Sequence, residues 1–141
     1  MTERYCYIHT IGCQMNVYDS EQILRRLQTI GYRRCDSPDQ ADLIVLNTCA
    51  IREKAEQKVY SFLGRQAKRK QSRPELLVAV GGCVAQQEGR RLLERIPHLD
   101  LVFGTHAVGR LAEHVTAIRK SRAPIVDVAM DGGRGMFEDL Q

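Results

Sequence analysis

The stretch ADLIVLNTC at residues 41–49 decides the fold. Its centre is an unbroken apolar run, which is typical of a strand that helices cover on both faces of a parallel sheet. Similar strand-like runs occur at residues 4–11 (RYCYIHTI) and 76–80 (LLVAV). Two shorter strands are expected at 32–35 and 99–103.

Segments with helical spacing of apolar residues separate these strands. We expect a helix capped by Asp19 and ended by Gly31, and further helices at 50–71, 84–96 and 108–118. Strands that alternate with helices predict an α/β fold, a doubly wound and mostly parallel five-stranded sheet with helices on both faces. The expected fold is flavodoxin-like, with strand order 2-1-3-4-5. One domain is expected at residues 1–121, followed by a linker at 122–141.

Composition excludes several classes of protein. The chain has 141 residues, 43% of them hydrophobic, and no run approaches the roughly 18 apolar residues of a membrane span. The start of the chain lacks the pattern of a secretory signal, so we expect a cytoplasmic protein with no membrane partner. Residues 52–73 carry eight basic and two acidic side chains. This basic stripe indicates either contact with RNA phosphates or an ordinary solvated helix face.

Three of the five cysteines directly follow predicted strands: Cys13 the first, Cys49 the third and Cys83 the fourth. Because the carboxyl ends of parallel strands share one edge of the sheet, we expect these thiols to converge. Each also precedes a predicted helix, whose amino end favours the metal-binding thiolate. The glycines at 12, 81 and 82 are expected to let the backbone come close and to leave room for a bulky cofactor. Cys6 and Cys35 are expected to be structural.

Three thiolates with no evident fourth ligand favour an iron–sulfur cluster with one open iron. A structural zinc site, which normally needs four protein ligands, is the first alternative. A flavin site is the second, but the loop GCQMN at 12–16 lacks the hydroxyl groups of a phosphate-binding loop. The histidines at 9, 98 and 106 are expected away from the cysteines. Four polar residues flank the site and are expected either to donate hydrogen bonds to cofactor or substrate or to cap helices and turns: Gln14, Asn16, Asn47 and Thr48.

Three motifs resemble the methylthiotransferase family, in its tRNA branch (MiaB type). They are GCQMN at 12–16, ADLIVLNTCAIREKA at 41–55 and GGCVAQ at 81–86. The resemblance implies an N-terminal domain that binds an auxiliary [4Fe–4S] cluster through three cysteines, here Cys13, Cys49 and Cys83. It also implies a full enzyme that adds a methylthio group, obtained from a sulfur donor, to N6-isopentenyladenosine next to the tRNA anticodon.

The same resemblance implies two further domains. A central radical domain would bind S-adenosylmethionine and a second [4Fe–4S] cluster through a Cys-x3-Cys-x2-Cys motif, and a C-terminal TRAM domain would bind RNA. No Cys-x3-Cys-x2-Cys motif occurs in this chain. We therefore expect a fragment that binds a cluster and has no activity alone. A substrate other than this tRNA, either another RNA or a ribosomal protein, remains the alternative.

Overall fold

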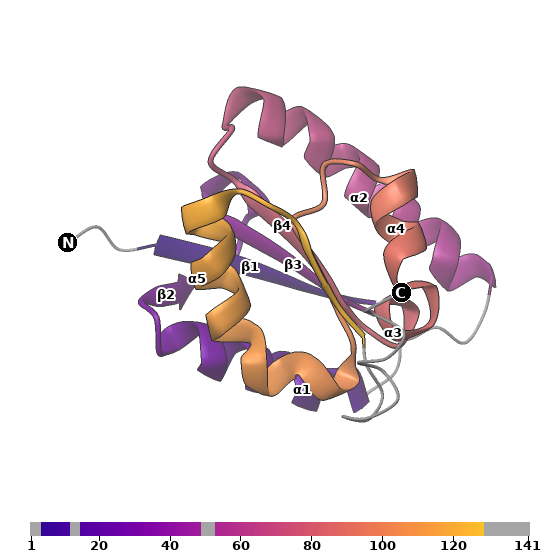
Figure 1. Ribbon diagram of the computed structural model, residues 1–141, viewed down its shortest axis with the longest axis horizontal. Helices are drawn as coiled ribbons and strands as arrows, with labels where there is room; N and C mark the ends of the chain where they lie inside the picture. The colour runs from indigo at the N-terminus through magenta and orange to yellow at the C-terminus, as the bar shows by residue number, and fades with distance from the viewer. Residues whose placement is uncertain (1–3, 12–14, 49–52, 129–141) are drawn as a thin grey trace.

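A six-stranded parallel sheet forms the centre of the protein in the computed structural model, which describes residues 4–11, 15–48 and 53–128 (Figure 1). The strand order is β2-β1-β3-β4-β5-β6, and every neighbouring pair is parallel. The strands are β1 (Arg4–Ile11), β2 (Tyr32–Arg34), β3 (Leu43–Thr48), β4 (Leu77–Gly82), β5 (Leu101–Phe103) and β6 (Ile125–Asp127). The predicted α/β class and the predicted order of the first five strands are confirmed.

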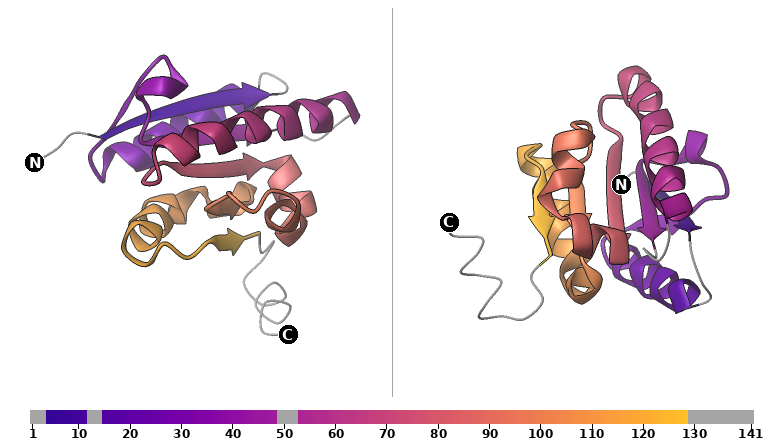
Figure 2. Two further views of the ribbon diagram at one scale, coloured as in Figure 1. Left: turned by 90° about the horizontal axis from the view of Figure 1, so that it is seen from above. Right: turned by 90° about the vertical axis from the view of Figure 1, so that its right-hand side faces the viewer.

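Helices cover both faces of the sheet, as predicted (Figure 2). They are α1 (Met15–Gln28), α2 (Glu53–Ser72), α3 (Cys83–Glu88), α4 (Arg90–Arg95) and α5 (Leu111–Ser121), with 3-10 turns at Pro38–Gln40 and Thr105–Arg110. Buried side chains of α2, α3 and α4 pack on one face, and those of α1 and α5 pack on the other.

The central strands explain the apolar runs in the sequence. All six residues of β3 and all six of β4 are buried. Ile44 and Leu46 belong to the core under α2, whereas Leu43 and Val45 belong to the core under α1 and α5. A strand whose alternate side chains both face helices favours apolar residues on both faces, because a polar group buried there needs a hydrogen-bond partner.

Three expectations about the elements were wrong. The sheet has six strands instead of five, because Ile125–Asp127 pairs with β5 inside the stretch predicted as linker. The helix predicted at 84–96 is two helices, broken at Gly89, whose φ of +52° does not continue a helix. The first helix begins at Met15, ahead of Asp19, so Asp19 is not its N-cap.

An ion cluster fastens β6 to the body of the protein. The carboxylate of Asp127 accepts hydrogen bonds from Arg110 at 2.8 and 3.1 Å and lies 2.7 Å from Nε2 of His114. Its side chain is only 15% exposed. The hydrogen bond from Arg110 is the largest cause of the lowered pKa of Asp127, and burial opposes it.

We expect Asp127→Asn to lower the free energy of unfolding by about 1 kcal/mol at neutral pH, because it removes a partly exposed ion pair. Because the pKa of Asp127 is lower in the folded state, its ionised carboxylate stabilises the folded protein at pH values above the unfolded pKa of about 3.9. This stabilisation is lost as the pH falls through the pKa of Asp127 in the folded state. The difference between the two proteins should therefore shrink below about pH 4. Urea unfolding at a series of pH values measures it.

Asp39→Asn is the matched control, because Asp39 also pairs with an arginine but its side chain is 76% exposed. It should change stability by less than about 0.5 kcal/mol. A difference for Asp127→Asn that persists unchanged in acid would contradict the role given to its charge.

Candidate functional site

The ends of β1, β3 and β4 define the candidate site. Ile11, the last residue of β1, pairs in register with Thr48, the last of β3, and Thr48 pairs with Gly82, the last of β4. Adjacent strands lie about 4.8 Å apart. The three strands therefore finish side by side, at the same level of one sheet edge.

The predicted ligands follow these three strand ends. Cys49 comes directly after Thr48, Cys83 directly after Gly82, and Cys13 two residues after Ile11. Cys13 and Cys49 lie outside the described residues. Cys83 is the first residue of α3, and its side chain is not described. The backbone leading to all three cysteines thus meets at one edge, and the convergence of the thiols stays a prediction.

Gly82 allows the closest backbone approach at this edge. Its φ is +92°, and a Cβ atom built there would lie 2.1 Å from the carbonyl oxygen of Thr48. A Cβ atom on Gly81 would lie 2.3 Å from the ring of Phe103. Protein atoms thus occupy the space beside both glycines. The expected close approach of the backbone is confirmed at Gly82, whereas the space beside Gly81 is filled by Phe103, so the two glycines permit close packing of β4 against β3 and β5.

Buried and partly buried hydrogen bonds lie beneath the site. The hydroxyl of Thr10 lies 2.7 Å from that of Ser20, which also accepts a hydrogen bond from Nδ2 of Asn47 at 2.9 Å. The hydroxyl of Thr48 donates to the carbonyl of Gly81 at 2.7 Å. These bonds link α1 with β1 and β3, and β3 with β4, just below the strand ends.

The network clarifies the flanking polar residues. Asn47 and Thr48, both buried, direct these donors at protein atoms. Gln14 lies outside the described residues, and the side chain of Asn16 is not described. Sequence reasoning did not predict the hydrogen bonds of Ser20, because it placed Ser20 at the start of a helix and not in the interior of α1. Its position seven residues after Cys13 was the available signal.

Gln86 is a second residue that sequence reasoning did not place. It lies one turn after Cys83 in α3, and its Nε2 donates to the carbonyl of Val128 at the end of β6. Its Oε1 is buried and has no hydrogen-bond partner in the described part of the chain. A Cβ atom on Gly104 would lie 1.8 Å from this oxygen, so a side chain there would displace Gln86. Gln86 therefore ties the helix that follows β4 to the strand that ends the sheet.

The histidines are used elsewhere, as expected. His9 stacks on Phe62 with ring centroids 4.7 Å apart, and burial lowers its pKa, with a smaller contribution from Arg65. His98 contacts the carbonyl of Leu63 at 2.7 Å. Across residues 4–11, 15–48 and 53–128, no group of three potential metal ligands is present.

Cys6 and Cys35 are structural, as expected. Both are buried and free of disulfides. Burial raises the pKa of the Cys6 thiol to about 12 and raises that of Cys35 as well. A thiol with a raised pKa stays protonated at neutral pH and is a poor metal ligand.

A hollow of about 760 Å³ lies at the opposite, amino-terminal edge of the sheet. Arg119 in its wall donates from Nε to the hydroxyl of Tyr32 at 2.8 Å, and burial raises the pKa of Tyr32. This arginine joins α5 to β2. The hollow is therefore at the far end of the strands from the predicted cysteine site.

In the described segments no helix combines the length and the apolar character needed to cross a membrane.

Comparison with known proteins identifies relatives of the whole described domain. Residues 5–104 match the family described as uncharacterized protein family UPF0004. The chain is 56% identical over 124 residues to a tRNA-2-methylthio-N(6)-dimethylallyladenosine synthase of Desulfosudis oleivorans, which is 88% of this chain and 27% of that protein. It is 58% identical over 122 residues to the synthase of the same name in Syntrophotalea carbinolica, which is 86% of this chain and 28% of that protein.

A third synthase of this name, from Syntrophobacter fumaroxidans, is 47% identical over 136 residues, which is 96% of this chain and 30% of that protein. The chain therefore spans less than a third of the length of these curated relatives. The matched segment contains β1 to β5 and all three strand ends of the candidate site. The chain belongs to the UPF0004 family, and the domain that it forms is the part that it shares with the tRNA methylthiotransferases named above.

Proposed function

We propose that the chain holds an auxiliary [4Fe–4S] cluster through Cys13, Cys49 and Cys83. The observation that supports it is the register of β1, β3 and β4, whose last residues Ile11, Thr48 and Gly82 pair in one row. Three cysteines that follow this row in the sequence would have a common space above the sheet edge within reach. Thiolates are the usual ligands of iron–sulfur clusters, so the donor set fits the group.

The described residues hold in place the elements from which the proposed cluster ligands extend. The hydrogen bonds of Ser20 fix α1 against β1 and β3 at the level where the strands end. The glycine pair brings β4 against its neighbours, so that Cys83 starts its helix next to the end of β3. Three protein ligands on a four-iron cluster leave one iron open, and such an iron supplies a site where a sulfur-containing group can bind.

We further propose that this chain serves the methylthiolation of N6-isopentenyladenosine next to the anticodon of a tRNA. The support is the shared name of its relatives, which are tRNA-2-methylthio-N(6)-dimethylallyladenosine synthases at 47–58% identity. Radical chemistry on S-adenosylmethionine, a second cluster and a C-terminal RNA-binding domain are assigned to regions that the relatives have beyond the matched segment. The chain that follows β6 would then lead toward these regions.

Reconstitution tests the cluster. The chain, treated anaerobically with iron and sulfide, should bind about four iron atoms and absorb broadly near ~400 nm. The variant Cys13→Ser/Cys49→Ser/Cys83→Ser should lose both signals, because it removes every proposed ligand. Iron and sulfide assays with a visible spectrum measure the outcome.

Cys35→Ala is the control for this experiment, because Cys35 is buried and bonds only the carbonyl of Ser37 through its thiol among the described contacts. It should retain full iron. Iron that survives the triple substitution would refute the assignment. One equivalent of zinc in a colourless protein would favour the zinc alternative instead.

Gly82→Ala tests whether the glycine beside Cys83 positions the site. The new methyl group would meet the backbone of Thr48 and force a residue with positive φ, at a cost of about 1–3 kcal/mol in folding free energy. We expect a lower unfolding midpoint and substantially reduced iron per chain after reconstitution.

Gly31→Ala is matched in backbone strain, since Gly31 has a φ of +93° but nothing within 4 Å of its would-be Cβ atom. It should lose some stability and keep its iron. Equal iron content in the two glycine variants would show that the close approach at Gly82 does not shape the cluster site.

A further inference from the structure

The basic side chains of α2 form two groups with different surroundings. Arg69 and Lys70 in its last turn, with Arg73 directly after it, are held by acidic side chains of other elements. These ion pairs are Arg69–Asp39 at 2.9 Å, Lys70–Asp100, and Arg73–Asp42 at 2.7 Å. The side chains of Lys70 and Asp100 are only 17% and 10% exposed, so this pair fixes α2 onto the sheet. This group belongs to the structure of the fold.

The second group is free. It comprises exposed basic side chains of α2 and α4, and none of them has an acidic partner among the described residues. We call this set the basic face: Lys58, Arg65, Lys68, Arg90, Arg91 and Arg95.

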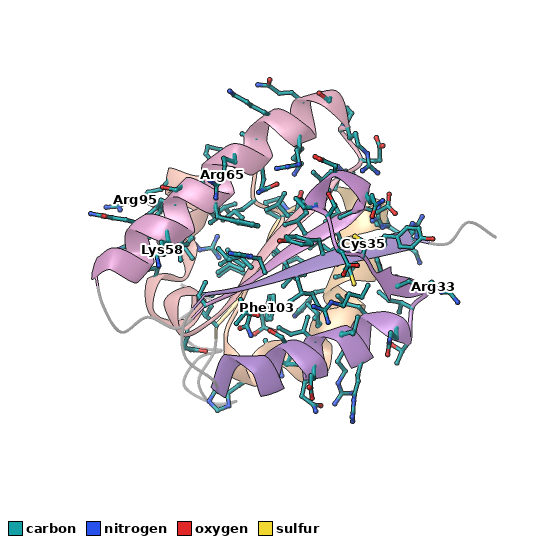
Figure 3. The ribbon with its side chains drawn as sticks, turned by 180° about the vertical axis from the view of Figure 1, so that it is seen from behind. Arg33, Cys35, Lys58, Arg65, Arg95 and Phe103 are labelled. Atoms are coloured by element: carbon teal, nitrogen blue, oxygen red, sulfur yellow. The ribbon has the colours of Figure 1, made fainter. Side chains whose placement is uncertain are left out.

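A contact joins the two helices that carry the basic face, on the flank of α2 where Tyr60 lies. The guanidinium of Arg95 in α4 lies over the ring of Tyr60 in α2, 5.5 Å from its centroid, and donates to the Tyr60 hydroxyl at 3.3 Å. Lys58 and Arg65 are seven residues apart, which is about two helical turns and places them on the same side of α2. That side is about half a turn away from Tyr60, so Lys58 and Arg65 lie on one flank of α2 and Arg95 projects at the other (Figure 3).

The basic face begins at the edge where the candidate site lies. α2 starts at Glu53, four residues after Cys49, and α4 starts at Arg90, seven residues after Cys83. Both helices then run back from that edge toward the other end of the sheet (Figure 1). A ligand lying along the basic face would therefore have one end next to the strand ends of the site.

The opposite helical layer does not offer a comparable surface. Arg110 is bound to Asp127 there, and Arg119 is bound to Tyr32. Its remaining basic side chains, Arg25, Arg26 and Lys120, share α1 and α5 with the exposed acids Glu21 and Glu113, whereas the six cations of the basic face share α2 and α4 with one exposed acid among the described side chains, Glu94.

We propose that the basic face binds the phosphodiester backbone of the substrate tRNA and leads the target base to the carboxyl edge of the sheet. This inference rests on the proposed function. An extended array of unpaired cations matches the regular negative charges of a nucleic acid backbone. Four of the six side chains are arginines, whose planar guanidinium groups bind phosphate oxygens in pairs. A tRNA is also the substrate that the names of the relatives give.

The test compares two triple variants of the chain in binding a fluorescent stem-loop RNA with the sequence of a tRNA anticodon arm. Lys58→Gln/Arg65→Gln/Arg91→Gln removes three charges from the basic face and no ion pair among the described residues. Arg25→Gln/Arg26→Gln/Lys120→Gln removes three charges from the opposite layer. Fluorescence anisotropy at several salt concentrations gives Kd and its salt dependence.

We expect the basic-face variant to bind the RNA roughly 10-fold more weakly near 100 mM salt. The slope of its plot of log Kd against log salt concentration should be smaller by about 2, because three phosphate contacts are removed. The control variant should stay within twofold of the unsubstituted chain. Equal losses in both variants, or no salt-dependent binding by the unsubstituted chain, would overturn the proposal. Polyglutamate serves as a probe for an acidic protein partner. If it bound as tightly as the RNA, and this binding were lost in the basic-face variant, the face would be assigned to an acidic protein and the proposal would be overturned.

Iron content after reconstitution, measured on the same preparations, separates this inference from the proposed function. Both triple variants should hold as much iron as the unsubstituted chain, because none of the substituted residues lies at the strand ends. RNA binding confined to the basic face in a chain that takes up no iron would support the face and refute the cluster. Iron uptake without face-dependent RNA binding would support the cluster and refute the face.

Discussion

The parallel pairing of β1, β3 and β4 in one register is the constraint on which the rest of the structure depends. It places Ile11, Thr48 and Gly82 in one row at the sheet edge. A shift of one residue in any of these strands would turn its side chains to the other face and disrupt the packing of both cores. The burial of every residue in β3 and β4 therefore fixes the register, and the register in turn fixes where the chain leaves each strand. The core and the candidate site are consequences of the same pairing.

Position in the fold gives chemically identical side chains different roles. Cys6 and Cys35 are buried thiols whose raised pKa keeps them protonated, whereas the proposed cysteine ligands begin where strands end. The basic residues of α2 divide in the same way. Lys70 holds the helix to Asp100, while Arg65 has no acidic partner in the described chain and faces outward. Surroundings, and not residue type, separate side chains that maintain the fold from those available to a ligand.

Errors in the sequence predictions occurred where a distant partner outweighs the local pattern. Three residues of β6 carry too little alternation to indicate a strand, and they form one because β5 presents an unpaired edge and Arg110 and His114 hold Asp127. The helix after β4 breaks at Gly89, although the apolar spacing continues across it. Gly81 was expected to make room for a cofactor, yet the ring of Phe103, which is distant in sequence, fills that space.

The sequence by itself determined the α/β class, the order of the first five strands and the placement of three cysteines directly after strands. These properties follow from local periods, since a continuous apolar run marks a buried strand and a cysteine after it must lie at its end. Only the tertiary structure decided that the three strand ends form one level row, that Ser20 links α1 to β1 and β3, and which cations of α2 remain unpaired. The reason is physical: register, hydrogen bonding and ion pairing depend on residues that packing brings together. These residues are far apart along the chain, so no local sequence pattern indicates which of them will pair.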